Sequence, residues 1–170
     1  MKRKSLLFVI PILAITVFSS CIEKGPKEEI LDEATLLTKY IRDIEKEHNV
    51  DTTALGVFYY VREPGGGENI YPEFGDTLTL VYDGFLIDGN LFYSTNLLAE
   101  EKRIIVFGEE VNAIEGWNDG LKVIEKDSKV ELIIPSTLGF GDKWNTDMNI
   151  PPNNTLIYIV EMVNIKKKNN

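Results

Sequence analysis

The alternation of apolar and polar residues over most of the chain is the feature that most limits how it can fold. Within residues 77–86, for example, Leu78, Leu80 and Tyr82 fall at every second position, which is the period of a β-strand with one buried face. Similar short stretches recur and are separated by turn residues such as glycine and proline. We expect strands at 57–61, 77–86, 91–94, 103–107, 130–134 and 155–165.

Only one stretch in this region has the period of a helix. Trp117, Leu121 and Ile124 follow one another at steps of four and three residues, so residues 114–124 predict one short α-helix. Apolar residues make up 44% and charged residues 26% of the chain, which is typical of a globular protein. The predicted fold class is therefore α+β, a twisted antiparallel β-sheet of five to six strands wrapped on one short α-helix and preceded by an N-terminal amphipathic helix.

Charge and composition exclude several classes of function. The chain has 170 residues and a formal net charge of −9. So acidic a protein repels the phosphates of nucleic acids, and we expect no nucleic-acid partner. It has one cysteine, Cys21, which is too few for a disulfide framework or a thiolate zinc site. Its one histidine, His48, makes a Ser-His-Asp triad or a histidine metal site hard to build. We expect no metal and no other cofactor.

The first 20 residues have the pattern of an export signal. Three basic residues at positions 2–4 precede an apolar run over residues 6–18, which is shorter than the roughly 20 residues of a membrane-spanning helix. Small residues then lead directly to Cys21. This resembles the cleavage box of a bacterial lipoprotein, in which the cysteine becomes the lipidated first residue and anchors the protein to a membrane of the cell envelope. The alternatives are a plain signal peptide or an uncleaved anchor, and all three place the rest of the chain outside the cytoplasm.

A tether and an amphipathic helix are expected between this signal and the strands. Gly25 and Pro26 are typical of a tether over residues 22–27, and apolar residues at steps of three and four predict a helix over residues 28–47. The helix packs on its own domain or, alternatively, pairs with that of a second chain, which makes the protein a monomer or a weak dimer. The predicted organisation is a lipoprotein signal peptide at 1–20, the tether and helix at 21–53, the folded domain at 54–166 and a charged tail at 167–170.

Three segments stand in order within the strand-rich region. They read GDTLTLVYDGFLIDGNLFYST at 75–95, IEGWNDGLKVIEKDSKVELIIPSTLGFG at 114–141 and IPPNNTLIYIVEMVNI at 150–165. With these spacings, residues 54–165 resemble the FK506-binding (FKBP) type of peptidyl-prolyl cis-trans isomerase. The resemblance implies a twisted sheet around one short helix, an aromatic pocket between them, and catalysis of rotation about Xaa-Pro bonds.

The resemblance also implies which residues form the pocket. Trp117 matches its floor, and Ile114 matches the residue whose backbone N–H anchors a ligand carbonyl. The catalytic residues implied are Tyr82, Phe92, Trp117, Tyr158 and Phe140. The substrate-binding residues implied are Ala113, Ile114, Ile150 and Tyr93.

Two of these positions depart from the family pattern. Tyr93 stands where the family has an aspartate, and Phe140 stands where a tyrosine donates to the bound amide carbonyl. The strand at 103–107 also lacks the usual wall aromatic, which falls near Arg103 or Ile104. The sequence therefore predicts a pocket that is more apolar and poorer in hydrogen bonds, with each missing bond weakening ligand binding by about 0.5–1.5 kcal/mol.

Rotation about an Xaa-Pro bond needs no nucleophile, metal or proton donor. Its barrier of about 18–20 kcal/mol comes from amide resonance, and a water-poor aromatic pocket favours the less dipolar, twisted amide over the planar ground state. We expect an isomerase that acts on proline-containing polypeptides and assists the folding of exported envelope proteins. One alternative is a weakly active or non-catalytic chaperone or adaptor that uses the same groove. Another is a structural subunit of an envelope complex that binds through the helix at 28–47.

Overall fold

A computed structural model describes residues 32–97, 101–110 and 113–169, and these fall in one compact unit of the chain. The predicted signal peptide, Cys21 and the tether lie outside the described residues and stay predictions. Within the described ranges, no helix combines the length and the apolar character needed to cross a membrane.

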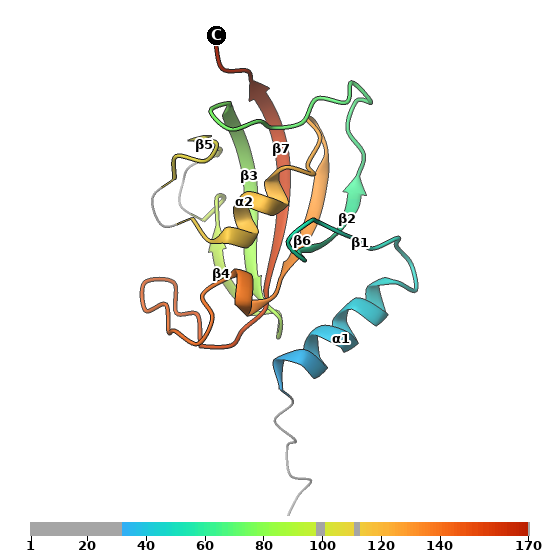
Figure 1. Ribbon diagram of the computed structural model, residues 1–170, viewed down its shortest axis with the longest axis vertical. Coiled ribbons are helices and arrows are strands. Elements are labelled where there is room, and N and C mark those ends of the chain that lie inside the picture. Colours follow the sequence, from blue (N-terminus) through green and yellow to red (C-terminus); the bar gives the residue numbers. More distant parts are fainter. Residues whose placement is uncertain (1–31, 98–100, 111–112, 170) are drawn as a thin grey trace, which may run out of the picture. The chain divides into compact units, whose positions relative to one another are not determined.

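One antiparallel sheet of seven strands forms the centre of the unit (Figure 1). The strand order is β1-β2-β6-β7-β3-β4, and β5 pairs with the first part of β3. The predicted α+β fold class is confirmed; the strand beyond the predicted five to six is β1, which has only two residues and therefore no visible period. The strands are β1 (Asp51–Thr52), β2 (Phe58–Glu63), β3 (Thr77–Leu86), β4 (Leu91–Ser94), β5 (Arg103–Val106), β6 (Lys129–Ile134) and β7 (Leu156–Lys166).

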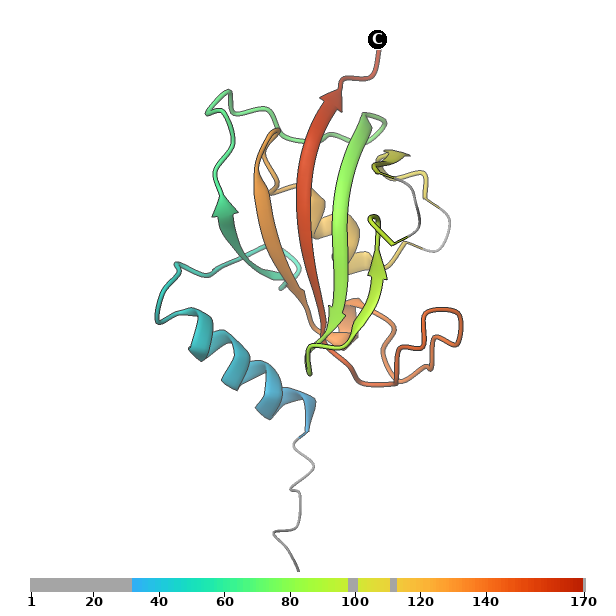
Figure 2. The same cartoon turned by 180° about the vertical axis from the view of Figure 1, so that it is seen from behind.

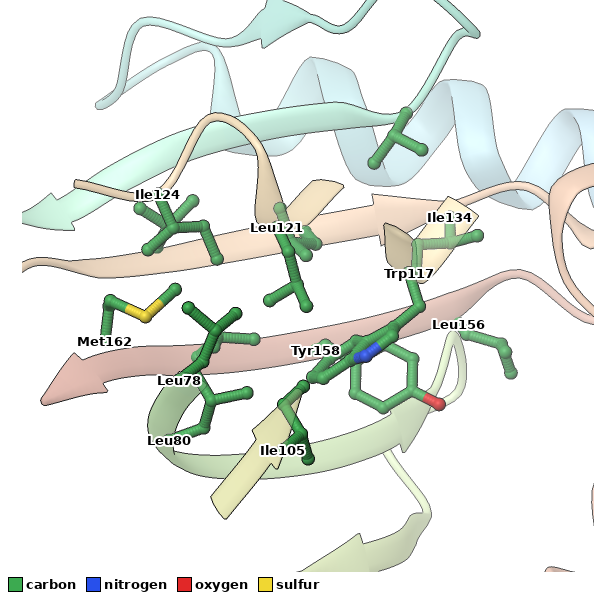
Figure 3. Packing of buried hydrophobic residues seen from close by; sticks show 14 of the residues in the cluster. Leu78, Leu80, Ile105, Trp117, Leu121, Ile124, Ile134, Leu156, Tyr158 and Met162 are labelled. Carbon is green, nitrogen blue, oxygen red and sulfur yellow. The ribbon is translucent and has the colours of Figure 1, made fainter. Parts of the chain in front are cut away.

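The main hydrophobic core lies between one face of the sheet and helix α2 (Glu115–Leu121). Leu78, Leu132 and Leu156 point to this face from three different strands and are fully buried, as is Leu121 of α2. Figure 1 shows α2 lying across the strands, and Figure 3 shows the packed side chains beneath it. The period-two pattern of the sequence thus identifies the buried face correctly.

Two glycines let α2 approach the sheet closely. A Cβ atom at Gly116 would lie 2.3 Å from Cγ2 of Ile134, and one at Gly120 would lie 2.6 Å from Cδ1 of Leu132. Both distances are shorter than real carbon contacts, so any larger residue would force α2 away from β6. Trp117 lies between these two glycines on the same helix. The close packing of α2 therefore sets the distance between Trp117 and the sheet.

The second helix, α1 (Glu33–Ile44), packs on the opposite face of the sheet (Figure 2). Asp32 caps it by accepting a hydrogen bond of 2.8 Å from the Thr35 backbone N–H. The helix ends at Ile44, three residues before the predicted end. It packs on its own domain, which is the first of the two expected arrangements; the oligomeric state stays a prediction. The contact between α1 and the sheet forms a second hydrophobic cluster. It consists of Leu37, Tyr40, Ile41 and Ile44 of α1 and Phe58, Tyr60, Phe85, Ile133 and Ile157 of the sheet.

Candidate active site

A cavity of about 250 Å³ opens beside α2. Tyr82 lines it from β3, Tyr93 from β4, Arg103 from β5, Trp117 from α2 and Tyr158 from β7. These elements are far apart in the sequence, so only the folded sheet brings their side chains together. The remaining lining residues come from the connections around α2 and after β6, and they are Glu110, Ala113, Ile114, Phe140 and Met148.

The walls of the cavity are aromatic, with Trp117 at their centre. The centroid of its ring system lies 4.8 Å from that of Tyr82 and 5.0 Å from that of Tyr158, and Figure 3 shows the indole beside the Tyr158 ring. Tyr93 stacks on Tyr82 with a centroid distance of 4.7 Å and an angle of 13° between the rings. Trp117 is 6% and Tyr158 is 7% exposed. A small ring that enters this cavity therefore loses most of its contact with water.

All but two of the predicted pocket residues line the cavity. Phe92 lies behind the wall instead, where its ring meets Tyr158 edge-on at 5.5 Å and 88°. It fits there because β3 has a glycine at the crossing point: a Cβ atom at Gly84 would lie 2.7 Å from the Phe92 ring. Phe92 thus supports Tyr158. Ile150 is 1% exposed and belongs to the main core, because the turn before it folds back and pairs Ile150 with Asn145.

Two charged residues correct the prediction of a more apolar pocket. The Nε1–H of Trp117 donates a hydrogen bond of 3.1 Å to Oε2 of Glu110. The other carboxylate oxygen of Glu110 lies 3.7 Å from Nη2 of Arg103. Both residues line the cavity. The cavity thus contains a carboxylate, although Tyr93 stands where the family pattern has an aspartate.

Sequence patterns gave little indication of these two residues. Arg103 stands at the position that lacks the usual wall aromatic, and that departure was its only signal. Glu110 follows β5 in a connection without any period. Met148 is likewise in a loop, where spacing does not predict which side chains turn inward.

The hydroxyls of Tyr82 and Tyr158 in the cavity stay protonated. Burial, followed by the neighbouring Tyr93 hydroxyl, raises the pKa of Tyr82. Burial also raises the pKa of Tyr158, with the negative charge of Glu110 among the smaller causes. Both hydroxyls are therefore neutral at physiological pH, and Glu110 and Arg103 are the charged residues among the described residues that line the cavity.

Comparison with known proteins agrees with this geometry. The family model described as FKBP-type peptidyl-prolyl cis-trans isomerase matches residues 68–163, more than half of the chain. The chain belongs to this family. The matched range contains every strand from β3 to β6, helix α2 and most of β7. It therefore includes all ten residues that line the cavity.

Two bacterial proteins illustrate the sequence similarity of this FKBP-type chain. It is 37% identical over 128 residues to the FKBP-type peptidyl-prolyl cis-trans isomerase FkpA of Escherichia coli K12, covering 75% of this chain and 44% of that protein. It is 32% identical over 130 residues to a probable FKBP-type peptidyl-prolyl cis-trans isomerase of Haemophilus influenzae, covering 76% and 51%. The chain thus spans about half the length of the curated relatives it matches.

Solved structures show the same fold. The crystal structure of FkpA from Escherichia coli superimposes with a TM-score of 0.67 at 33% identity, covering 79% of this chain and 59% of that one. A peptidyl-prolyl cis-trans isomerase from Pseudomonas syringae pv. tomato has a TM-score of 0.63 at 23% identity and covers 79% of this chain and 96% of that one.

Proposed function

We propose that this protein is a peptidyl-prolyl cis-trans isomerase that acts on proline-containing polypeptides. The observation that carries the proposal is the cavity around Trp117, whose walls are rings from three strands and one helix. A prolyl ring buried there leaves its amide in a water-poor site. Because the twisted amide is less dipolar than the planar one, such a site lowers the barrier to rotation.

The polar groups of the cavity fix the peptide in place. Ala113 and Ile114 reach the cavity just before α2 begins at Glu115. The backbone N–H of Ile114 donates to no carbonyl in the described residues, and in the proposed complex it binds a substrate carbonyl. The charges of Arg103 and Glu110 lie at the same cavity and offer hydrogen bonds to the peptide on either side of the proline. Orientation and desolvation together are sufficient for this reaction, which forms and breaks no covalent bond.

A non-catalytic chaperone or adaptor is the second candidate function. Two observations favour it: Phe140 lines the cavity without a hydroxyl, and Tyr93 fills the position of the family's aspartate. A domain of this kind would hold proline-containing or apolar segments in the same cavity without accelerating rotation.

The place of action that we propose is the bacterial cell envelope. The basic start, the short apolar run and Cys21 support export followed by lipid attachment to a membrane. An isomerase held there would meet exported polypeptides as they fold, and slow Xaa-Pro isomerisation, which takes tens to hundreds of seconds, limits such folding.

The decisive experiment compares two tryptophan variants of the full chain, purified in detergent. Trp117→Leu removes the centre of the cavity, whereas Trp144→Leu removes an indole that is 54% exposed and does not line it. We expect the parent and Trp144→Leu to accelerate isomerisation of a proline peptide, and Trp117→Leu to lose most of that activity. A parent that binds the peptide but does not accelerate isomerisation would favour the chaperone or adaptor instead.

A further inference from the structure

Glu33, in the first turn of α1, binds both ends of one loop. Its Oε1 accepts hydrogen bonds from the Ser136 backbone N–H at 2.8 Å and from the Thr155 hydroxyl at 2.6 Å. Its Oε2 accepts a third bond from the Ser136 hydroxyl. Ser136 lies two residues after the end of β6, at the start of a short 3-10 helix (Ser136–Leu138), and Thr155 directly precedes β7. One carboxylate therefore joins the two points at which residues 137–154 leave and rejoin the sheet.

That loop supplies part of the candidate active site. Phe140 and Met148 both lie on it and both line the cavity. Within the loop, the Gly141 N–H donates to the Ser136 carbonyl at 2.8 Å, and the Asn153 N–H donates to the Gly141 carbonyl at 2.7 Å. These two bonds connect Ser136, which Glu33 binds, to Gly141. The cavity residue Phe140 directly precedes Gly141 in the chain.

The two loop residues that bind Glu33 are buried. Ser136 is 3% exposed and Thr155 is fully buried. Because these donors belong to buried residues, losing the carboxylate leaves buried polar groups without an acceptor, which costs free energy unless another acceptor replaces it. The three bonds lower the pKa of Glu33 although its partial burial works to raise it. The carboxylate is therefore charged at neutral pH, when its bonds to the loop are strongest.

The rest of α1 is attached elsewhere. Its apolar residues pack on the outer face of the sheet, and the Tyr40 hydroxyl donates to Oε1 of Glu131 at 2.7 Å. Among the described residues, Glu33 and Tyr40 are the members of α1 whose side chains form hydrogen bonds with the domain. Of these two side chains, Glu33 is the one that is hydrogen-bonded to the ends of the loop that reaches the cavity.

We propose that Glu33 is a positioning residue for the active site: the docking of α1 fixes residues 137–154, and thereby holds Phe140 and Met148 at the cavity. The helix and the cavity are on opposite faces of the sheet, and the loop that passes around the end of β6 and β7 connects them (Figure 2). A partner or a membrane that displaced α1 would in this way loosen one wall of the cavity. The part of this proposal that concerns catalysis rests on the proposed function.

The test compares Glu33→Ala with Tyr40→Phe in the full chain. Each variant removes the hydrogen bonds of one α1 side chain to the domain, but only Glu33→Ala releases the loop. The direct readout is hydrogen exchange of the Gly141 and Asn153 amides. We expect exchange in Glu33→Ala to accelerate by about tenfold or more, as for the loss of a bond to a charged acceptor, and to be unchanged in Tyr40→Phe. Glu33→Gln, which keeps an acceptor oxygen, should recover part of the protection.

Kinetics give the second readout. In Glu33→Ala we expect KM for a proline peptide to rise while kcat falls less, because Trp117, Tyr82 and Tyr158 remain in place. Equal effects of Glu33→Ala and Tyr40→Phe on exchange, or no change at Gly141 and Asn153, would overturn the proposal. If the parent protein does not isomerise the peptide, the proposed function fails, and the exchange experiment still decides whether Glu33 holds the loop.

Discussion

The indole of Trp117 donates a hydrogen bond to the carboxylate of Glu110, with Nε1 and Oε2 separated by 3.1 Å. This bond joins Trp117, at the centre of the cavity, to the segment between β5 and α2, which carries no recognisable motif. It also holds the carboxylate beside Arg103, at 3.7 Å. Glu110 therefore links the orientation of the indole to the charge of the cavity.

Removing the Glu110 carboxylate should lower kcat/KM, because Trp117 loses a hydrogen bond that orients its indole. In Glu110→Ala the indole N–H loses its acceptor, and Arg103 loses its ion pair with position 110. We expect kcat/KM to fall by an amount equivalent to about 0.5–1.5 kcal/mol. Glu110→Gln keeps an acceptor for the indole and should lose less. The measurement is isomerisation of one proline peptide, accompanied by the tryptophan emission spectrum. Equal losses in the two variants would show that the bond to Trp117 is not what matters.

Restoring a hydroxyl at position 140 should tighten ligand binding. Phe140 lines the cavity, and Phe140→Tyr adds a donor where the family usually has one. We expect the parent to bind macrolides of the FK506 kind weakly, and the variant to bind about 0.5–1.5 kcal/mol more tightly if the hydroxyl meets its acceptor. Titration calorimetry checks this. Phe74→Tyr, at a 61% exposed ring outside the cavity, is the control. Equal affinities of the parent and Phe140→Tyr would mean that the added hydroxyl finds no acceptor.

The Asp76 carboxylate should make stability depend on pH. It is 2% exposed and accepts bonds from the Glu73 N–H, the Lys168 N–H and the Lys167 ammonium at 2.8, 2.9 and 3.1 Å. Burial works to raise its pKa, but these bonds outweigh burial and lower it below the usual 3.8. A group with a lowered pKa in the folded state stabilises the fold above its unfolded-state pKa, and this contribution is lost as pH falls through the lower, folded-state value.

We therefore expect Asp76→Asn to reduce the free energy of unfolding by about 1.5–3 kcal/mol at neutral pH. The difference from the parent should shrink as the pH falls below the usual carboxyl range. Urea unfolding at several pH values measures both. A difference that stayed constant down to the most acidic pH would contradict the assignment to the Asp76 charge.

Lipid attachment predicts a specific effect of Cys21→Ala. If Cys21 is the lipidated first residue, the variant should remain unprocessed or move out of the detergent phase on phase separation. Mass spectrometry of the parent should find a lipid on Cys21. Unchanged partitioning of the variant, with no lipid in the parent, would leave the plain signal peptide or the uncleaved anchor.

The sequence alone predicted the strands well, because their signal is local. The bounds of β3 and β4 agree with the predicted segments at 77–86 and 91–94. Both the alternation of apolar and polar residues and the Asp88-Gly89 turn can be recognised in the sequence. The fully buried Leu78 and Leu132 were predicted for the same reason. The two-residue strand β1 is too short to show a period.

The candidate site was only partly predictable, since loops and side-chain directions depend on tertiary packing. Motifs placed Trp117, Tyr82 and Tyr158 correctly at the cavity. They could not show that Phe92 supports the wall from behind, because this depends on the space over Gly84. Glu33 was visible only as an acidic residue near the start of a helix; its partners Ser136 and Thr155 lie far along the chain.

The edge strands of the sheet affect how the protein behaves in crowded surroundings. One edge consists of β1, with two residues, and residues 60–63 of β2, with which β1 does not pair; the other is divided between β4 and β5, with four residues each. An unpaired strand of that length offers few backbone N–H and C=O groups on which another extended chain could add. A domain proposed to handle unfolded polypeptides at a membrane meets such extended chains constantly. In that proposed role, short sheet edges would limit co-aggregation of such chains along the backbone of the domain.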